Sequence, residues 1–174
     1  MQVAIIGAGP LGRRLALAAA RAGFVVLLED VMPSNLHHAQ EYLRQELGPA
    51  ALPSVRFVST IEEAVREADL AIDCVPDELE SKLEIFSLLD RMAPPKTVLV
   101  SPMKNTSIAD LASCTYRPEK CIAVLADAKE LADASLSEIR LQTPPQVAEP
   151  TVILVRDFWE RLGFTVSITV ESTP

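Results

Sequence analysis

The chain of 174 residues is 49% hydrophobic and 23% charged, which is typical of one soluble globular domain and excludes a disordered or fibrous chain. Its net charge of −8 argues against nucleic acid and against an anionic membrane surface as the main partner. No apolar run reaches the ~18 residues that a membrane span requires, and the first residues show no signal peptide. We therefore expect a single cytoplasmic domain over residues 1–174.

The cysteines and histidines give no indication of a metal site. Cys74, Cys114 and Cys121 form no CxxC pair and are predicted to be reduced thiols. The two histidines, His37 and His38, are neighbours whose side chains would point about 100° apart on a helix. Because this spacing suits neither a zinc site nor a catalytic triad, we expect no bound metal.

The hydrophobic pattern alternates between strand and helix periods along the chain. Strands are predicted, in chain order, over residues 2–6, 24–29, 55–58, 70–74, 97–100 and 121–125. Helices are predicted over residues 11–22, 34–47, 60–67 and 78–92. The third helix is expected to begin at a capping box of Thr60 with Glu63. The fifth strand is expected to stop at a turn that contains Pro102.

Strands that alternate with helices predict right-handed βαβ crossovers and a parallel sheet, and nearly continuous apolar strands indicate helices on both faces. After the sixth strand, residues 138–142 and 164–170 are predicted as edge strands, antiparallel at the C-terminal end. Residues 150–162 fit a strand or a helix, and Pro150 with Gly163 favours the helix. The expected fold is an α/β, Rossmann-type, doubly wound domain with a mostly parallel sheet.

Residues 7–12 read GAGPLG, a G-x-G-x-x-G motif between the first predicted strand and the first predicted helix. In this context the first glycine permits a tight turn, the second lets a diphosphate approach the main chain, and the third allows close helix–strand packing. The free N–H groups and the dipole of the helix would face the anion. The residues predicted to bind a dinucleotide here are Gly7, Gly9, Pro10, Leu11 and Gly12. A glycine turn needed only for packing is the alternative.

The second predicted strand ends in an acidic pair, Glu29 and Asp30. A carboxylate at this point accepts hydrogen bonds from the adenosine ribose and repels a 2′-phosphate, so NAD is favoured over NADP. We assign this role to Asp30, because strand alternation turns only one of the two side chains towards the ligand. Arg13 and Arg14 either add positive charge near the phosphates or are solvated.

Several segments of the chain are similar to the NAD-binding domain of the 3-hydroxyacyl-CoA dehydrogenases. The similarity is most specific in VAIIGAGPLGRRLA, VVLLEDVMPSNL, the stretch from STIEEAV to TVLVS, and SIADLA. The resemblance implies an NAD-dependent oxidoreductase fold that acts on CH–OH groups in fatty-acid metabolism. It also implies cofactor contacts by Asp30, by Cys74, Val75 and Pro76 after the fourth strand, and by Asp77 and Lys82.

The substrate side of the site departs from that family's pattern. The family carries SNTS where this chain has Ser101, Pro102, Met103 and Lys104. The family's general base, a histidine, matches Leu125, and the asparagine of the same HFFNP motif matches Ala128. The orienting carboxylate of the family matches Glu138 only with a one-residue shift. The chain also has no room for the family's coenzyme A arm before the third strand, and no segment that matches the helical C-terminal domain.

These departures leave three hypotheses. The first is an NAD(H)-binding domain with weak or no hydroxyacyl-CoA turnover and with no catalytic residue of the family retained. The second is a divergent NAD-dependent dehydrogenase that uses Lys104, or Asp127 or Lys129, as acid or base. The third is a protein-binding module without a cofactor. A second copy or a partner chain is expected to cover the open cleft.

Overall fold

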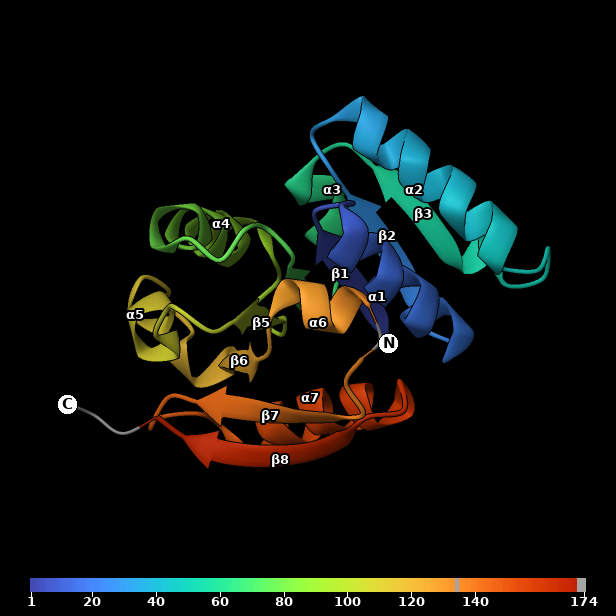
Figure 1. Ribbon diagram of the computed structural model, residues 1–174. Helices are drawn as coiled ribbons and strands as arrows, with labels where there is room; N and C mark the ends of the chain where they lie inside the picture. The colour runs from blue at the N-terminus through green and yellow to red at the C-terminus, as the bar shows by residue number, and fades with distance from the viewer. Residues whose placement is uncertain (134, 172–174) are drawn as a thin grey trace.

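The computed structural model describes residues 1–133 and 135–171 and contains one eight-stranded sheet with the strand order β3-β2-β1-β4-β5-β6-β7-β8 (Figure 1). The strands are β1 Gln2–Ile6, β2 Val25–Glu29, β3 Val55–Val58, β4 Leu70–Asp73, β5 Val98–Met103, β6 Cys121–Leu125, β7 Glu138–Thr143 and β8 Thr165–Val170. The helices are α1 Pro10–Arg21, α2 Pro33–Glu46, α3 Ile61–Val65, α4 Leu79–Met92, α5 Ile108–Ser113, α6 Ala128–Ala132 and α7 Glu149–Arg161. Two 3-10 turns, η1 Leu52–Ser54 and η2 Pro118–Lys120, precede β3 and β6.

The first six strands are parallel, which confirms the predicted Rossmann-type sheet. β7 pairs antiparallel with β6, as expected for the C-terminal end, while β8 runs parallel to β7. The prediction that residues 138–142 form an edge strand is wrong, because β7 lies between β6 and β8. β8 alone is the edge on this side. Buried and exposed side chains alternate along β7. This pattern occurs both in edge strands and in inner strands with one solvated face, so it does not distinguish the two.

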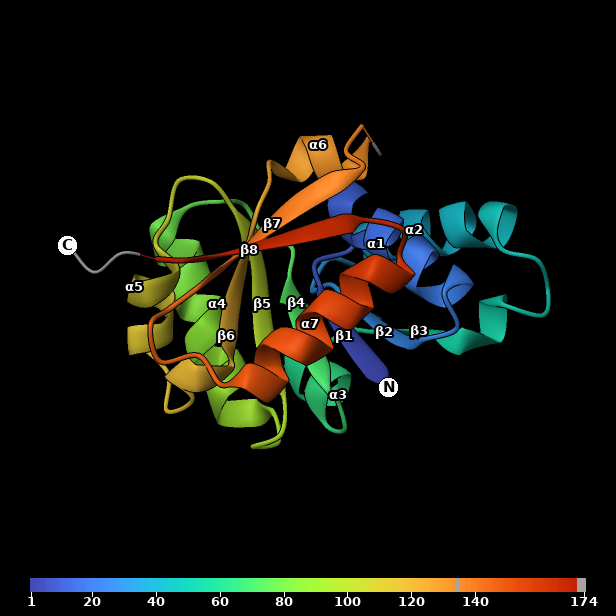
Figure 2. The same cartoon turned by 90° about the horizontal axis from the view of Figure 1, so that it is seen from below.

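Helices cover both faces of the sheet (Figures 1 and 2). Alternate side chains of each strand enter different cores, so Val3 and Ile5 pack in the layer with α1, α2 and α7, and Ala4 and Ile6 pack in the layer with α3, α4 and α5. Nearly continuous apolar strands were the signal for this double burial.

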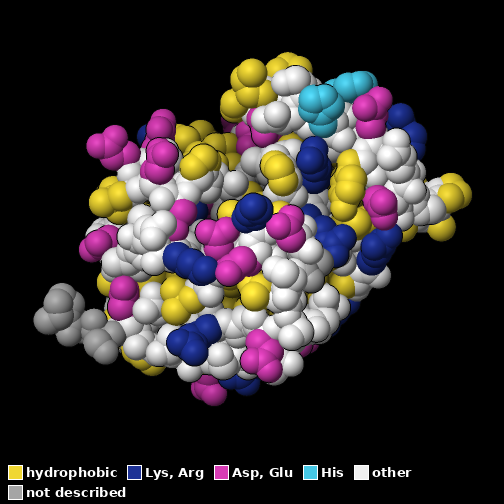
Figure 3. Space-filling model, in the orientation of Figure 1, with side chains coloured by type: hydrophobic (Ala, Val, Ile, Leu, Met, Phe, Trp, Pro, Cys, Tyr) yellow, Lys and Arg dark blue, Asp and Glu magenta, His cyan; other side chains and the backbone are white. Residues whose placement is uncertain are grey.

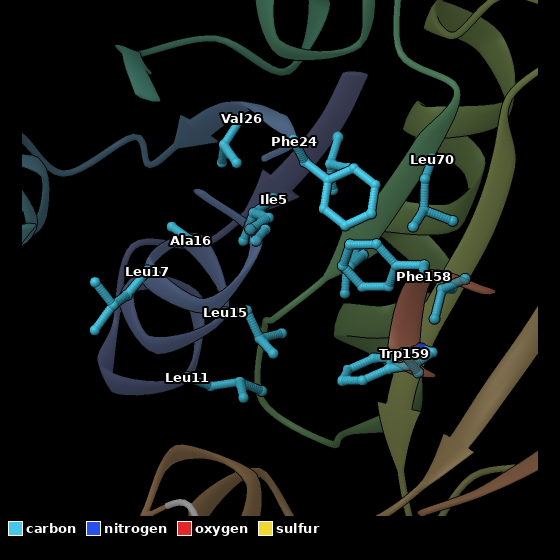
Figure 4. Close-up of a cluster of buried hydrophobic side chains, with 14 of the residues drawn as sticks. Ile5, Leu11, Leu15, Ala16, Leu17, Phe24, Val26, Leu70, Phe158 and Trp159 are labelled. Atoms are coloured by element: carbon cyan, nitrogen blue, oxygen red, sulfur yellow. The ribbon is translucent and has the colours of Figure 1, made fainter. Parts of the chain in front are cut away.

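Helix α7 confirms the helical interpretation of residues 150–162. The β-branched run TVILV at its start is what made the segment resemble a strand, whereas Val155 and Phe158 lie on its buried face. Phe158 lies between Phe24 and Trp159, with ring centroids 5.2 and 5.4 Å away (Figure 4). Trp159 is fully buried in the core that also holds Leu11 and Leu15, and Arg161 donates to the carbonyl of Ala22, so α7 is attached to α1.

β5 differs from the prediction, because it continues through Pro102 to Met103 instead of ending at residue 100. β4 pairs with β5 only as far as Val100, and beyond that point β5 is paired with β6 alone. A proline is tolerated where one side of a strand has no neighbour to receive its N–H. The rim that follows β5 therefore begins three residues later than predicted.

Candidate cofactor-binding site

A cavity of about 650 Å³ opens at the carboxyl ends of β1, β2 and β4. This volume lies within the usual range for small-molecule and cofactor sites. The strand order reverses between β1 and β4, and ligands of doubly wound sheets bind at this switch point. The lining residues are Gly7, Gly9, Pro10 and Leu11 at the start of α1, Asp30 and Asn35 after β2, Cys74, Val75 and Pro76 after β4, and Ala128, Lys129, Ala132 and Asp133 of α6 and its end.

The three glycines of the motif have three different physical roles. Gly7 has a φ of +103°, a conformation that favours glycine, and its N–H donates to the carbonyl of Glu29 at 2.8 Å. A Cβ on Gly12 would lie 1.7 Å from the carbonyl oxygen of Gly7, so only glycine permits this helix–strand contact. Gly9 has an ordinary φ of −68°, and a Cβ there would meet nothing within 4 Å. The chain itself therefore gives no reason for glycine at position 9.

The start of α1 is open to an anion. Its N-cap residue is Gly9, no side chain accepts a hydrogen bond at the cap, and the first turn carries no acidic residue. The first N–H groups of a helix have no intrahelical partner, and the dipole adds about half a positive charge at this end. Pro10 occupies the first helical position, where a missing N–H costs nothing.

The carboxylate of Asp30 is held at the cavity by three donors. It accepts hydrogen bonds from the N–H of Ala8 at 2.9 Å, from the N–H of Met32 at 2.8 Å and from Nδ2 of Asn35 at 3.0 Å. These bonds tie the end of β2 to the glycine turn. They fix the carboxylate beside the cavity, where its contact with a ribose stays a prediction.

The neighbouring carboxylate, Glu29, does not line the cavity. Its side chain lies on the same face of β2 as Leu27 and is only 3% exposed. No described residue forms a hydrogen bond with its Oε1. Burial, and then the charge of Asp30, raises the pKa of Glu29 to about 7. Glu29 therefore points away from the cavity that Asp30 lines.

A fully buried cluster of Asp73, Lys82 and Ser101 holds the turn after β4 through hydrogen bonds to its main chain. The Nζ of Lys82 lies 3.1 Å from Oδ2 of Asp73 and donates to Oγ of Ser101 at 2.9 Å, and that hydroxyl donates to Asp73 at 3.0 Å. The other oxygen of Asp73 accepts the N–H of Val75 at 2.9 Å, and Lys82 reaches the Val75 carbonyl at 3.4 Å. Both the N–H and the carbonyl of Val75 are therefore held. Burial, followed by the charge of Asp73, raises the pKa of the Cys74 thiol well above its ordinary value, so this thiol stays protonated.

A family model described as "3-hydroxyacyl-CoA dehydrogenase, NAD binding domain" matches residues 2–125. The chain belongs to this family. It is 31% identical over 136 residues to the probable 3-hydroxybutyryl-CoA dehydrogenase of Bacillus subtilis, a match that covers 71% of this chain and 47% of that protein. It is 32% identical over 128 residues to the L-carnitine dehydrogenase of Burkholderia mallei, covering 68% of this chain and 40% of that protein.

Solved structures agree with this assignment. The crystal structure of the 3-hydroxyacyl-CoA dehydrogenase from Archaeoglobus fulgidus is 25% identical with a TM-score of 0.83, covering 99% of this chain and 57% of that one. The crystal structure of 5-formyl-3-hydroxy-2-methylpyridine 4-carboxylic acid 5-dehydrogenase, described as an NAD⁺-dependent dismutase, also has a TM-score of 0.83 at 25% identity, covering 98% of this chain and 58% of that one. The chain thus spans about half the length of such relatives. NAD is the cofactor of this domain.

The NAD-binding domain brings eight of the predicted cofactor residues together around one cavity: Gly7, Gly9, Pro10, Leu11, Asp30, Cys74, Val75 and Pro76. The other three predicted residues do not line it. Gly12 packs against Gly7, and Lys82 is fully buried, with its Nζ near the carbonyl of Val75. Asp77 faces the loop after β5 instead.

Asp77 uses both carboxylate oxygens to hold that loop. It accepts the N–H groups of Lys104 at 2.7 Å and Asn105 at 3.0 Å, and the hydroxyl of Thr106 at 3.1 Å. Burial raises the pKa of Asp77, but the bonds from these two N–H groups outweigh it and keep the pKa below its ordinary value. Asp77 is therefore ionised and engaged by its own chain.

Helix α6 forms the remaining wall of the cavity and was not predicted from the sequence. Asp127 and Glu130 form a capping box at its start, and Glu130 also pairs with Lys104 at 2.7 Å. The sequence DAKE contains the capping-box signal, but five residues are too few for a visible helical period.

Two further predictions concern residues outside the cavity. Thr60 caps α3 by accepting the N–H of Glu63 at 3.3 Å, as predicted. Arg13 lies over the ring of Tyr42 at 5.7 Å, and neither Arg13 nor Arg14 lines the cavity.

The described residues contain neither a candidate metal site nor a membrane-spanning helix. Residues 1–133 and 135–171 hold no group of three His, Cys, Asp or Glu residues that could bind a metal ion. Within the same residues no helix is long and apolar enough to cross a membrane. The three cysteines are free thiols.

Proposed function

We propose that this chain binds NAD(H) in the cavity and has weak or no hydroxyacyl-CoA dehydrogenase activity of its own. The diphosphate lies on the N–H groups at the start of α1, and Asp30 binds the adenosine ribose. The observation that carries this proposal is Gly9, whose missing side chain leaves open space that no described residue fills. A diphosphate that approaches the main chain needs this space. Cys74, Val75 and Pro76 form the wall along which the dinucleotide continues.

NAD is preferred over NADP in this proposal because Asp30 is already bound by three donors of the chain itself. Its charge is fixed at the cavity and would repel a 2′-phosphate. Lys129 lines the cavity as well, but it belongs to α6 and not to the segment after β2.

Weak turnover follows from the residues that match the family's base and amide. Leu125, which matches the base, ends β6 with a side chain that cannot exchange a proton, and Ala128 offers no hydrogen bond from its side chain. Loss of a positioned acid or base typically lowers a rate by about 10²–10⁴. When hydride leaves the carbon of a CH–OH group, such a base is needed to accept the proton that the hydroxyl releases.

A second candidate function is a divergent dehydrogenase with Lys104 or Asp127 as the base. The surroundings of both residues speak against it. The hydrogen bond to Glu130 raises the pKa of Lys104, which keeps this lysine protonated. Asp127 accepts the N–H of Lys129 at 2.8 Å as the cap of α6. If Lys104→Met leaves a measured dehydrogenase activity unchanged, the lysine version of this alternative is wrong.

The proposal includes a cover for this end of the sheet, formed by a second copy or by a partner chain. Large apolar side chains stand exposed in the segments that follow β2 and β4: Val31 is 72% exposed, Met32 54% and Leu79 45%. Exposed apolar surface of this kind is typical of interaction sites. Light scattering coupled to size-exclusion chromatography, with and without NADH, gives the oligomeric state directly.

The experiment that tests the proposal is a titration with NADH followed by an assay with acetoacetyl-CoA. We expect saturable NADH binding and a thermal stabilisation that grows with NADH concentration, by about 2.7 kcal/mol at 100 times Kd. Turnover at the rate of an ordinary family enzyme would refute the second half of the proposal. No binding and no stabilisation by NAD or NADH would refute the first half and favour a protein-binding module without a cofactor.

A further inference from the structure

Helix α6 contributes one cationic side chain to the cavity that the start of α1 also lines. Ala128, Lys129, Ala132 and Asp133 line the cavity from this side, and α6 packs against α1. Lys and Arg side chains lie beside Asp and Glu side chains over the position of α6 in Figure 3, which has the orientation of Figure 1. The wall is therefore polar and charged on its outer surface.

The charges around the cavity are unbalanced for an anionic ligand. Among the described residues that line it, the ionisable side chains are Asp30 and Asp133, which are acidic, Lys129, which is basic, and the protonated thiol of Cys74. Without Lys129 a diphosphate would meet two carboxylates and only the amides and dipole of α1 as positive partners. Lys129 is therefore the only basic side chain among the described residues that line the cavity.

Lys129 is free to contact such a ligand. Its main-chain N–H donates to Asp127, but no hydrogen bond or ion pair of its Nζ occurs within residues 1–133 and 135–171. The next lysine along this rim, Lys104, is already paired with Glu130 at 2.7 Å. That ion pair joins the loop after β5 to α6 and so helps to hold the helix in place.

We propose that Lys129 is a positioning residue for the cofactor and binds the dinucleotide's diphosphate across the cavity from the N–H groups of α1. This inference rests on the proposed function, because it concerns the same cavity. It assigns to α6 the role of a fixed wall that brings a positive charge to the phosphates. The role differs from that of an acid or base, because Lys129 then acts on the phosphates and leaves the redox half of the cofactor untouched.

The test compares Lys129→Met and Lys129→Arg with Lys120→Met by calorimetric titration of NAD and ADP-ribose. Methionine suits a helix as well as lysine, and the cap of α6 uses only the main chain of residue 129, so α6 is retained. Lys120 is a matched control, because it lies before β6, at the opposite end of that strand, and its Nζ donates to the carbonyl of Pro95. ADP-ribose carries the diphosphate but lacks the nicotinamide.

We expect Lys129→Met to weaken binding of NAD and of ADP-ribose by the same factor, roughly tenfold at low salt, as for loss of a charge-assisted hydrogen bond. The factor should shrink as salt rises from about 10 to 300 mM, because screening removes the contribution of the charge. Lys129→Arg should restore affinity, Lys120→Met should bind like the unchanged chain, and the melting temperature of each free variant should stay within about 2 °C.

Three outcomes would overturn the inference. The first is NAD affinity of Lys129→Met within twofold of the unchanged chain at low salt. The second is a loss for NAD without a loss for ADP-ribose, which would place Lys129 at the nicotinamide. The third is a loss that does not respond to salt or that accompanies a large fall in melting temperature, which would indicate a structural role. Failure of the unchanged chain to bind NAD would instead refute the proposed function itself.

Discussion

The carboxylate of Asp30 accepts a hydrogen bond from the main-chain N–H of Ala8 at 2.9 Å. This bond joins the residue that follows β2 to the middle of the glycine turn that follows β1. The acid predicted to bind the ribose therefore also holds the turn predicted to bind the diphosphate. A substitution of Asp30 is expected to alter both contacts with the cofactor.

Asp30→Asn is expected to weaken NAD binding about tenfold and to reduce the preference for NAD over NADP. The amide keeps the shape of the side chain but removes the charge that repels a 2′-phosphate. It also converts one of the two carboxylate oxygens, which accept the N–H groups of Ala8 and Met32 separately, into an NH₂ donor, so one of these N–H groups loses its acceptor at a cost of about 1–3 kcal/mol of folding stability. Titrations with NADH and NADPH, together with urea unfolding, measure both effects.

Glu29→Gln is the matched control for that substitution, because Glu29 is the adjacent acid and does not line the cavity. The affinity of the Glu29→Gln variant for NADH should stay within about twofold of that of the unchanged chain. A tenfold loss in Glu29→Gln, with none in Asp30→Asn, would mean that the two acids have been assigned to the wrong roles.

Glu29 also predicts a pH dependence of stability. Burial, with the charge of Asp30, raises its pKa from 4.5 in the unfolded chain to about 7 in the fold. The folded state therefore binds this proton more tightly, so the free energy of unfolding should decrease as pH rises from about 4.5 to about 7 and level off above that. The decrease is about 1–3 kcal/mol. Urea unfolding between pH 4.5 and 8.5 should show it in the unchanged chain and a weaker slope in Glu29→Gln; identical slopes would contradict the assignment.

Lys82→Met is expected to destabilise the fold by about 3–5 kcal/mol, because it leaves the carboxylate of Asp73 buried without its cation. It should also weaken NADH binding, because the carbonyl of Val75, a residue that lines the cavity, loses the lysine that holds it. Lys96→Met is the control: Lys96 pairs with Asp69 at 2.6 Å, but its side chain is 57% exposed. An exposed pair contributes about 0–1 kcal/mol, so similar losses in the two variants would contradict this account.

The sequence was sufficient to locate the six parallel strands, apart from the end of β5, and the glycine turn, because these depend on local patterns. Buried parallel strands are continuous apolar runs, and Gly12 has no alternative beside the Gly7 carbonyl. The choice of Asp30 over Glu29 followed from the two-residue period of a strand. Each of these features is encoded within a few neighbouring residues.

The features that the sequence did not predict depend on contacts between distant segments. Pro102 is compatible with β5 only because β4 ends earlier, which no pattern around Pro102 reveals. β7 is an inner strand because β8, more than 20 residues later, pairs with it. Asp77 faces the loop at Lys104 instead of the cavity, a choice made by tertiary hydrogen bonds. α6 is too short to show a period, although it supplies one wall of the site.

The most direct test of the account is Gly9→Ala, measured as the NADH dissociation constant together with the melting temperature of the free chain. A methyl group at position 9 meets nothing within 4 Å in the chain and needs no change of φ, so the melting temperature should fall by no more than about 3 °C. The same methyl group would occupy the space of the diphosphate, and we expect at least a tenfold loss of NADH affinity. Unchanged NADH affinity in a normally folded Gly9→Ala variant would contradict the proposed position of the cofactor.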